Sequence, residues 1–158
     1  PRHGQQTRMP DVLFYHLENQ PLEKVLPQLL EKTVERGWRA VVETGSRERA
    51  EALDATLWTY RDDSFLPHGL AGDETDPDQP ILIATGSENP NGANVRFFVD
   101  RAVPQSAAGY ERIVFIFSGY DPDAVVEARG AWRALSADKG NAVTYWQQDP
   151  GGRWVKRA

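Results

Sequence analysis

The sequence contains no cysteine, a single methionine and three histidines among 158 residues. Without cysteine there is no disulfide framework, no thiolate-ligated zinc and no thiol nucleophile. The histidines, His3, His16 and His68, lie far apart, and none has a partner at metal-ligand spacing. No apolar run approaches the ~18 residues of a membrane span, and the first ten residues lack the apolar core of a secretory signal. These absences favour a cytoplasmic domain without a metal or cofactor.

Motifs for nucleotide and acyl chemistry are also missing. The first predicted strand-to-helix turn, HLENQPLEK over residues 16–24, has no glycine to bring backbone amides close to a phosphate. Neither a GxxxxGK[ST] loop nor a G-x-S-x-G elbow occurs, and the acidic stretch 62–78 lacks calcium-loop spacing. Ser118 follows a predicted strand, where an ordinary turn serine is the simplest interpretation. The residues therefore predict no catalytic site.

The formal net charge of −5 is unevenly distributed along the chain. Residues 1–90 carry 9 basic and 16 acidic side chains, and residues 91–158 carry 9 basic and 7 acidic ones. The front is therefore −7 and the back +2. A net acidic chain is a poor candidate for sequence-blind binding of nucleic acid, which needs clustered lysine and arginine.

Hydrophobic patterning predicts one α/β domain over residues 9–158. Residues 1–8 show no periodicity, so we expect an unstructured arm or a non-native leader, with Met9 a plausible native start. Pro27 lies inside the first helical pattern, so that helix either kinks there or starts late. Strands are predicted at 11–17, 38–44, 80–84, 93–99, 112–117 and 141–147, and helices at 21–37, 46–57 and 121–140.

The order of these elements indicates how the sheet is built. Strands alternate with helices at the front, which favours parallel pairing through right-handed crossovers. The strands between residues 80 and 117 have no convincing helix between them, which predicts some antiparallel pairing there. We expect a single-domain α/β fold, with one mixed, mostly parallel sheet flanked by helices on both faces.

Two segments carry features typical of binding surfaces. Trp58 precedes a loop that contains Phe65, Leu66, Pro67 and His68, where polar residues would be ordinary. This apolar segment is either exposed to a partner or folded back as a satellite core.

The second segment is the helix after Asp121. Arg129 and Arg133 are four residues apart and share one face, and Trp132 borders them. Trp132 is either a core-edge residue or an aromatic contact beside two guanidinium groups. The second arrangement suits an acidic peptide with an apolar side chain and a free carboxylate.

The sequence resembles the chi subunit family of bacterial DNA polymerase III holoenzyme over about residues 10–148. The resemblance is carried, in order, by LFYHL, RGWRAVVET, LWTYRDDSFLPHGLAGD, PILIATG and RIVFIFSGYD. It implies a fold related to nucleotide-binding domains but without their nucleotide site. It also implies an adaptor subunit of the replisome rather than an enzyme, touching DNA only indirectly and no membrane.

The resemblance further implies two partner surfaces. Chi-type subunits link the clamp loader to single-stranded-DNA-binding protein, whose acidic C-terminal tail ends in phenylalanine. Carried onto this chain, the tail site comprises Arg129, Trp132, Arg133, Ser118, Tyr120 and Thr144. The surface for the psi subunit, or an equivalent clamp-loader component, comprises Trp58, Phe65, Leu66, Pro67 and His68.

Two other functions remain open on the sequence. One is a small α/β nucleotide-binding domain or enzyme of unknown substrate. The other is a free-standing recruiter that brings a DNA-repair protein to coated DNA through the segment around Trp58.

Overall fold

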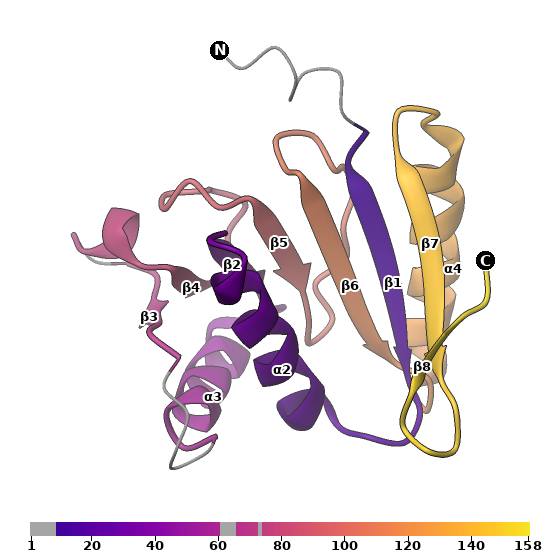
Figure 1. Ribbon diagram of the computed structural model, residues 1–158, viewed down its shortest axis with the longest axis horizontal. Coiled ribbons are helices and arrows are strands. Elements are labelled where there is room, and N and C mark those ends of the chain that lie inside the picture. The colour runs from indigo at the N-terminus through magenta and orange to yellow at the C-terminus, as the bar shows by residue number, and fades with distance from the viewer. Residues whose placement is uncertain (1–8, 61–65, 73) are drawn as a thin grey trace.

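The computed structural model describes residues 9–60, 66–72 and 74–158, which form one open α/β sheet with helices on both faces (Figure 1). The elements are β1 (Asp11–Leu17), α2 (Leu22–Glu35), β2 (Ala40–Glu43), α3 (Arg47–Trp58), β3 (Gly69–Leu70), a 3-10 turn (Asp76–Asp78), β4 (Ile81–Ala84), β5 (Val95–Phe98), β6 (Arg112–Ser118), α4 (Pro122–Ala137), β7 (Ala142–Gln148) and β8 (Trp154–Lys156).

The described strands form one sheet in the order β3-β4-β2-β5-β6-β1-β7-β8. Each neighbouring pair is parallel except β7 and β8, which confirms a mixed, mostly parallel sheet. The antiparallel pairing expected between residues 80 and 117 is wrong, because β4 and β5 both run parallel to β2, and β5 runs parallel to β6. The connections over residues 85–94 and 99–111 are long enough to return the chain to the starting end of the sheet without a helix.

Local signals place the helix starts. Ser46 caps α3, since its side chain accepts a hydrogen bond from the Arg49 amide at 3.2 Å. Asp121 caps α4 by accepting from the amides of the next turn. Pro21 precedes α2, and Pro27 is buried inside that helix, so the late start that would place Pro27 in the first turn is wrong.

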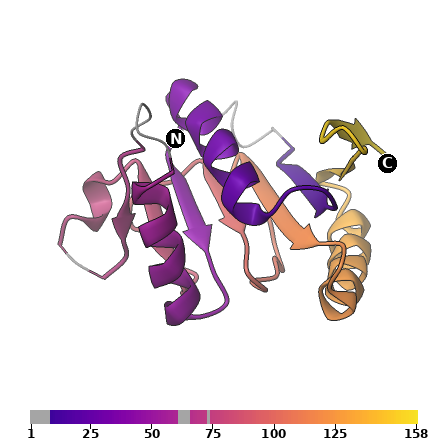
Figure 2. The ribbon, with the colours of Figure 1, turned by 90° about the horizontal axis from the view of Figure 1, so that it is seen from below.

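Helices α2 and α4 lie on opposite faces of the sheet (Figure 2), and an apolar layer lies between the sheet and the helices on each face. On one face, α2 and α3 bury side chains against the strands; the largest are Leu26, Leu30, Leu53, Ile81, Ile83 and Phe97. On the other face, α4 contributes small side chains that let it lie close to the sheet. This second layer contains Val12, Phe14, Ile113, Phe115, Phe117, Ala124, Ala128, Ala131 and Leu135.

A buried arginine holds the loops that replace helices on the α4 side of β2 and β5. The Arg96 side chain is 3% exposed and forms an ion pair with Glu43, whose carboxylate lies 2.8 Å from Nη2. Arg96 also donates to the Glu88 carbonyl at 2.9 Å, to the Tyr110 hydroxyl at 3.0 Å and to the Gly86 carbonyl. One side chain therefore fastens two separate loops to the sheet.

None of the helices within residues 9–60, 66–72 and 74–158 has the length and apolarity needed to cross a membrane.

Candidate functional site

The outer face of α4 carries a cationic surface next to an aromatic one. Arg129 and Arg133 are exposed, and Trp132 between them is half-buried. A spacing of four residues puts the two guanidinium groups on the same side of the helix, one turn apart. Because Asp121 and Pro122 fix the start of α4, they also fix which way this face points.

Trp132 is anchored from below by the aromatic core. Its ring makes edge contacts with Phe14 and Tyr145, at centroid distances of 5.3 Å and 5.7 Å. Phe14 and Tyr145 in turn lie nearly parallel, 6.2 Å apart. Trp132 is thus a core-edge residue that also borders the two arginines. An aromatic ring held in this way presents its free edge with little conformational freedom to lose on binding.

Tyr145 completes this surface, although no motif or spacing in the sequence singles it out. Its hydroxyl lies 2.7 Å from Nδ1 of His16, and burial raises the pKa of Tyr145 while the nearby Arg129 charge opposes that rise. His16 Nε2 lies 3.4 Å from the Glu18 carboxylate. Strand alternation alone would have grouped Tyr145 with Val143 and Gln147; its place under α4 depends on tertiary packing.

The other residues expected at this site lie elsewhere around α4. Thr144 pairs in register with Leu13 on the sheet face opposite α4, and its hydroxyl accepts from Trp146 Nε1 at 2.9 Å. Ser118 and Tyr120 lie at the turn before α4, where the Ser118 hydroxyl accepts from the Tyr120 amide at 3.2 Å. The structure therefore brings Arg129, Trp132 and Arg133 together, with Ser118 and Tyr120 at the helix start and Thr144 apart.

The segment around Trp58 is divided between surface and core. Trp58 is 52% exposed and stacks on the His68 ring at 4.2 Å, whereas Leu66 and His68 are buried and Pro67 is half-buried. Phe65 lies outside the residues that the structure describes. The segment does fold back, but Leu66 joins the main apolar layer under α2 and α3, so the separate satellite core is wrong. Trp58 faces solvent, and a partner for it stays a prediction.

His68 supports Trp58 rather than facing outward. Its Nδ1 lies 2.6 Å from the Leu66 carbonyl oxygen, and its Nε2 lies 3.2 Å from the Asp54 carboxylate. Both ring nitrogens are therefore held by oxygens of the chain, and the ring forms a fixed base for the indole.

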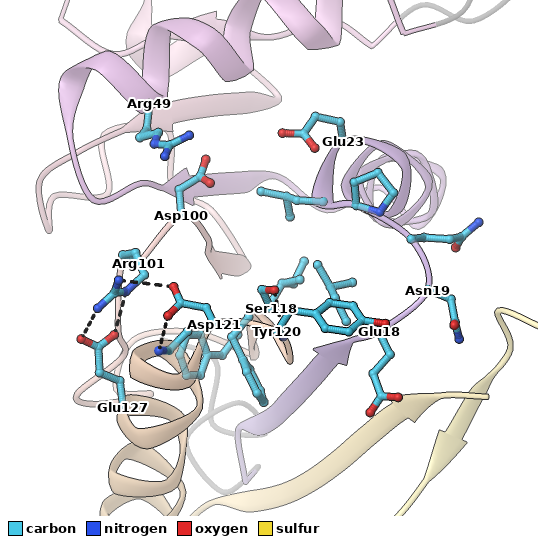
Figure 3. Close-up of a pocket in the computed structure, with 18 residues that line it drawn as sticks. Glu18, Asn19, Glu23, Arg49, Asp100, Arg101, Ser118, Tyr120, Asp121 and Glu127 are labelled. Carbon is cyan, nitrogen blue, oxygen red and sulfur yellow. Dashed lines mark hydrogen bonds and ion pairs between the residues drawn. The ribbon is translucent and has the colours of Figure 1, made fainter. Parts of the chain in front are cut away.

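A crevice of about 490 Å³ opens at the carboxyl ends of β1, β5 and β6, the edge where open α/β sheets usually bind ligands (Figure 3). Its floor is apolar, and Arg101 on one wall binds Glu127 at 2.7 Å and Asp121 at 3.5 Å.

Burial raises the pKa of Asp100, which faces the crevice near Arg49 (Figure 3). Five carboxylates line the crevice, from Glu18, Glu23, Asp100, Asp121 and Glu127, against two arginines. This balance disfavours a phosphate group.

The fold and the crevice together define a doubly wound α/β domain without the phosphate-binding loop of nucleotide-binding members of that class. The family model described as DNA polymerase III chi subunit, HolC, matches residues 9–143. The chain belongs to this family, which is named after a subunit of DNA polymerase III.

Two curated relatives carry the same name. A probable DNA polymerase III subunit chi from Rickettsia prowazekii (strain Madrid E) is 35% identical over 82 residues, which is 52% of this chain and 50% of the relative. The DNA polymerase III subunit chi of Pseudomonas aeruginosa PAO1 is 24% identical over 90 residues, which is 57% of this chain and 62% of the relative. The chain thus spans between half and two thirds of the length of these relatives.

Proposed function

We propose that the protein is a non-catalytic adaptor of DNA polymerase III holoenzyme. It links the clamp loader, through psi or an equivalent component, to the acidic C-terminal tail of single-stranded-DNA-binding protein. The observation that supports this most is the α4 face, where Arg129 and Arg133 flank a tryptophan anchored on the aromatic core.

The chemistry of this face matches a short acidic peptide that ends in an aromatic residue. Guanidinium groups bind carboxylates through paired N–H donors, so Arg129 and Arg133 contact the acidic side chains and the terminal carboxylate. Trp132 covers the terminal aromatic ring, and the Tyr145 hydroxyl offers a further polar contact beside Arg129. Ser118, Tyr120 and Thr144 are the less central members, because they lie away from the Arg129–Trp132–Arg133 cluster. Few residues contribute, so the affinity is modest and salt-dependent.

Titration of a fluorescent acidic peptide ending in phenylalanine tests this site. We expect binding at tens of micromolar in low salt, and loss of binding in Arg133→Glu. Arg36→Glu is the matched control, because Arg36 is also exposed and the charge change is identical, but it lies at the C-terminal cap of α2, away from α4. A peptide with an amidated C-terminus should bind more weakly. Equal binding by Arg133→Glu and wild type would show that the site is misplaced.

The second surface centres on Trp58, with Leu66, Pro67 and His68 behind or beside it. An exposed tryptophan on a fixed base is typical of an interface hot spot. Its partner is psi or an equivalent clamp-loader component; a DNA-repair protein is the alternative occupant. Capture from native extract with wild type and Trp58→Ala, followed by identification of the protein lost in the variant, distinguishes the two. The α4 peptide site should be unaffected by Trp58→Ala.

The alternative function is a small nucleotide-binding domain or enzyme, which the position of the 490 Å³ crevice favours and its acidic rim opposes. A nucleotide that binds the native state raises the melting temperature, and the shift grows with the logarithm of the ratio of its concentration to its Kd. A thermal-shift screen with nucleotides and magnesium therefore separates this function from the adaptor, for which no shift is expected.

A further inference from the structure

The face of the sheet opposite α4 is only partly covered by helices. Helix α2 contacts β2 and α3 contacts β4, while α4 contacts β6 and β7 from the other side. In Figures 1 and 2, among the described residues, no helix lies over β1 and β7 on the α2 side. The side chains that the register turns toward this open face are Leu13, Tyr15, Thr144, Trp146, Trp154 and Lys156.

Aromatic rings gather on this open face. Trp154 stacks on Tyr15 at a centroid distance of 4.6 Å, and Trp146 meets Tyr15 edge-on at 6.5 Å. All three are half-buried, so part of each ring surface remains accessible. Beyond Tyr15, the face continues into a groove of about 380 Å³ between α2 and the sheet, whose apolar floor includes Leu13 and Val114.

Basic side chains border the aromatic rings on both sides. Lys32, Arg36 and Arg112 line the groove, and Lys156 lies at the β8 end. Among the described residues, the buried Nε of Arg112 has no hydrogen-bond acceptor, and Nη2 of Arg112 lies 3.5 Å from the Asp11 carboxylate.

The local charge is therefore opposite to that of the whole chain. Four cations stand against two acids, Asp11 and Glu35, which gives +2 on a protein whose net charge is −5. The net charge of the whole chain argues against nucleic-acid binding. However, the charge of the surface that contacts the strand determines whether a nucleic acid binds.

We propose that this face, from the α2 groove to β8, binds single-stranded nucleic acid directly. Bases stack on Trp154 and Trp146 and on the apolar floor of the groove, while phosphates contact the four cations. From β6 across to β8 is three strand spacings of ~4.8 Å, about 14 Å. At ~3.4 Å per nucleotide of stacked strand this length holds about four phosphates, with Lys32, Arg36 and Arg112 at the α2 end and Lys156 at the β8 end.

A single strand fits this surface better than an acidic peptide. Cations at both ends of an aromatic strip suit a strand that crosses the face, because its bases can stack on the rings and its charge repeats along its length. The acidic tail of the proposed function needs a compact pair of arginines beside one ring, and α4 supplies that on the other face. The two sites are independent, so either can fail without the other.

Anisotropy of a fluorescein-labelled twelve-nucleotide thymidine strand, titrated with the full chain at about 20 mM salt, tests the proposal. The perturbing variant is Lys32→Glu with Arg36→Glu; the matched control is Arg129→Glu with Arg133→Glu. In both pairs the residues are exposed and four positions apart, and each variant changes the net charge from −5 to −9; Arg36 is the C-cap of α2, and the other three residues lie within helices. Urea unfolding with an unchanged slope shows that each variant is folded.

We expect the α2 variant to weaken strand binding at least tenfold while retaining the tail peptide, and the α4 variant to do the reverse. Affinity should fall with salt with a log–log slope near −3, at about −0.7 for each phosphate contact. Trp154→Leu should weaken binding about fivefold, and duplex DNA should bind at least tenfold more weakly than the single strand. Four results would overturn the proposal. The first three are no binding by wild type at 100 µM protein, loss of strand binding only in the α4 variant, and equal binding of duplex. Loss of the tail peptide in the α2 variant alone would place the peptide in this groove and also overturn it.

Discussion

Replacing Arg96 with methionine removes the guanidinium that fastens the loops beside β2 and β5. Methionine keeps much of the volume of the side chain, so the main loss is electrostatic. The Glu43 side chain is 20% exposed, and the substitution removes the cation with which its carboxylate forms an ion pair. The carbonyls of Gly86 and Glu88 also lose their donor.

The cost follows from these contacts. Breaking a buried ion pair by removing one partner costs about 3–5 kcal/mol, because the other charge stays buried. For a chain of this size the melting temperature falls by about 2–4 °C for each kcal/mol, so we expect a drop of roughly 6–20 °C. Adding Glu43→Leu should recover about half of the loss, since the orphaned carboxylate is removed while the loop carbonyls stay unpaired.

Urea unfolding followed by far-ultraviolet circular dichroism measures this loss directly. Arg47→Met is the matched control: Arg47 lies 3.4 Å from Glu51, and both side chains are more than half exposed. Its loss should be about 0.5 kcal/mol or less, as for other exposed pairs. If Arg96→Met costs less than 1 kcal/mol, the guanidinium does not hold the loops and our account of the helix-free crossovers is wrong.

Three further predictions concern His16 in β1 and the turn between β2 and α3. Burial lowers the pKa of His16, so the unfolded chain binds protons more readily; stability should fall as pH drops below about 6.5, and His16→Gln should flatten that dependence in urea titrations. In Gly45→Ala the new Cβ would lie 2.6 Å from the Asp100 carbonyl oxygen, so we expect a loss of about 1–3 kcal/mol in urea unfolding, and a loss below 0.5 kcal/mol would contradict this contact. Ser46→Ala removes the cap on the Arg49 amide and should cost about 1 kcal/mol by the same assay, whereas Ser46→Thr should retain most of it.

Elements with strong local signals were predictable from the sequence. Strand β1 agrees with its predicted bounds, and α3 and α4 begin at the caps that Ser46 and Asp121 provide. Pairing direction was not predictable for β4, β5 and β6, because it depends on how the chain returns between strands. Here Arg96 anchors loops to the sheet where a helix would ordinarily cross. The residues around Arg96 in the sequence do not reveal that Glu43 and Glu88 are its partners.

The candidate sites show the same limit. The grouping of Arg129, Trp132 and Arg133 followed from helical spacing, which is a local property. Tyr145 was missed because its neighbours, Phe14 and His16, come from the other end of the chain. The buried position of His68 was equally hidden, since a loop has no periodicity that separates an inward residue from an outward one.

The place of β1 in the sheet sets the timing of folding. Asp11 pairs with Arg112 on one side and with Ala142 on the other, so the first strand to be made has both of its neighbours more than 100 residues downstream. Ribosomes add about 5–20 residues per second, so β1 waits roughly 5–20 s for its first partner. Pairing across such separations is slow even in the complete chain. During synthesis, β2, β4 and β5 can pair first, while β1 stays unpaired and its apolar side chains stay uncovered.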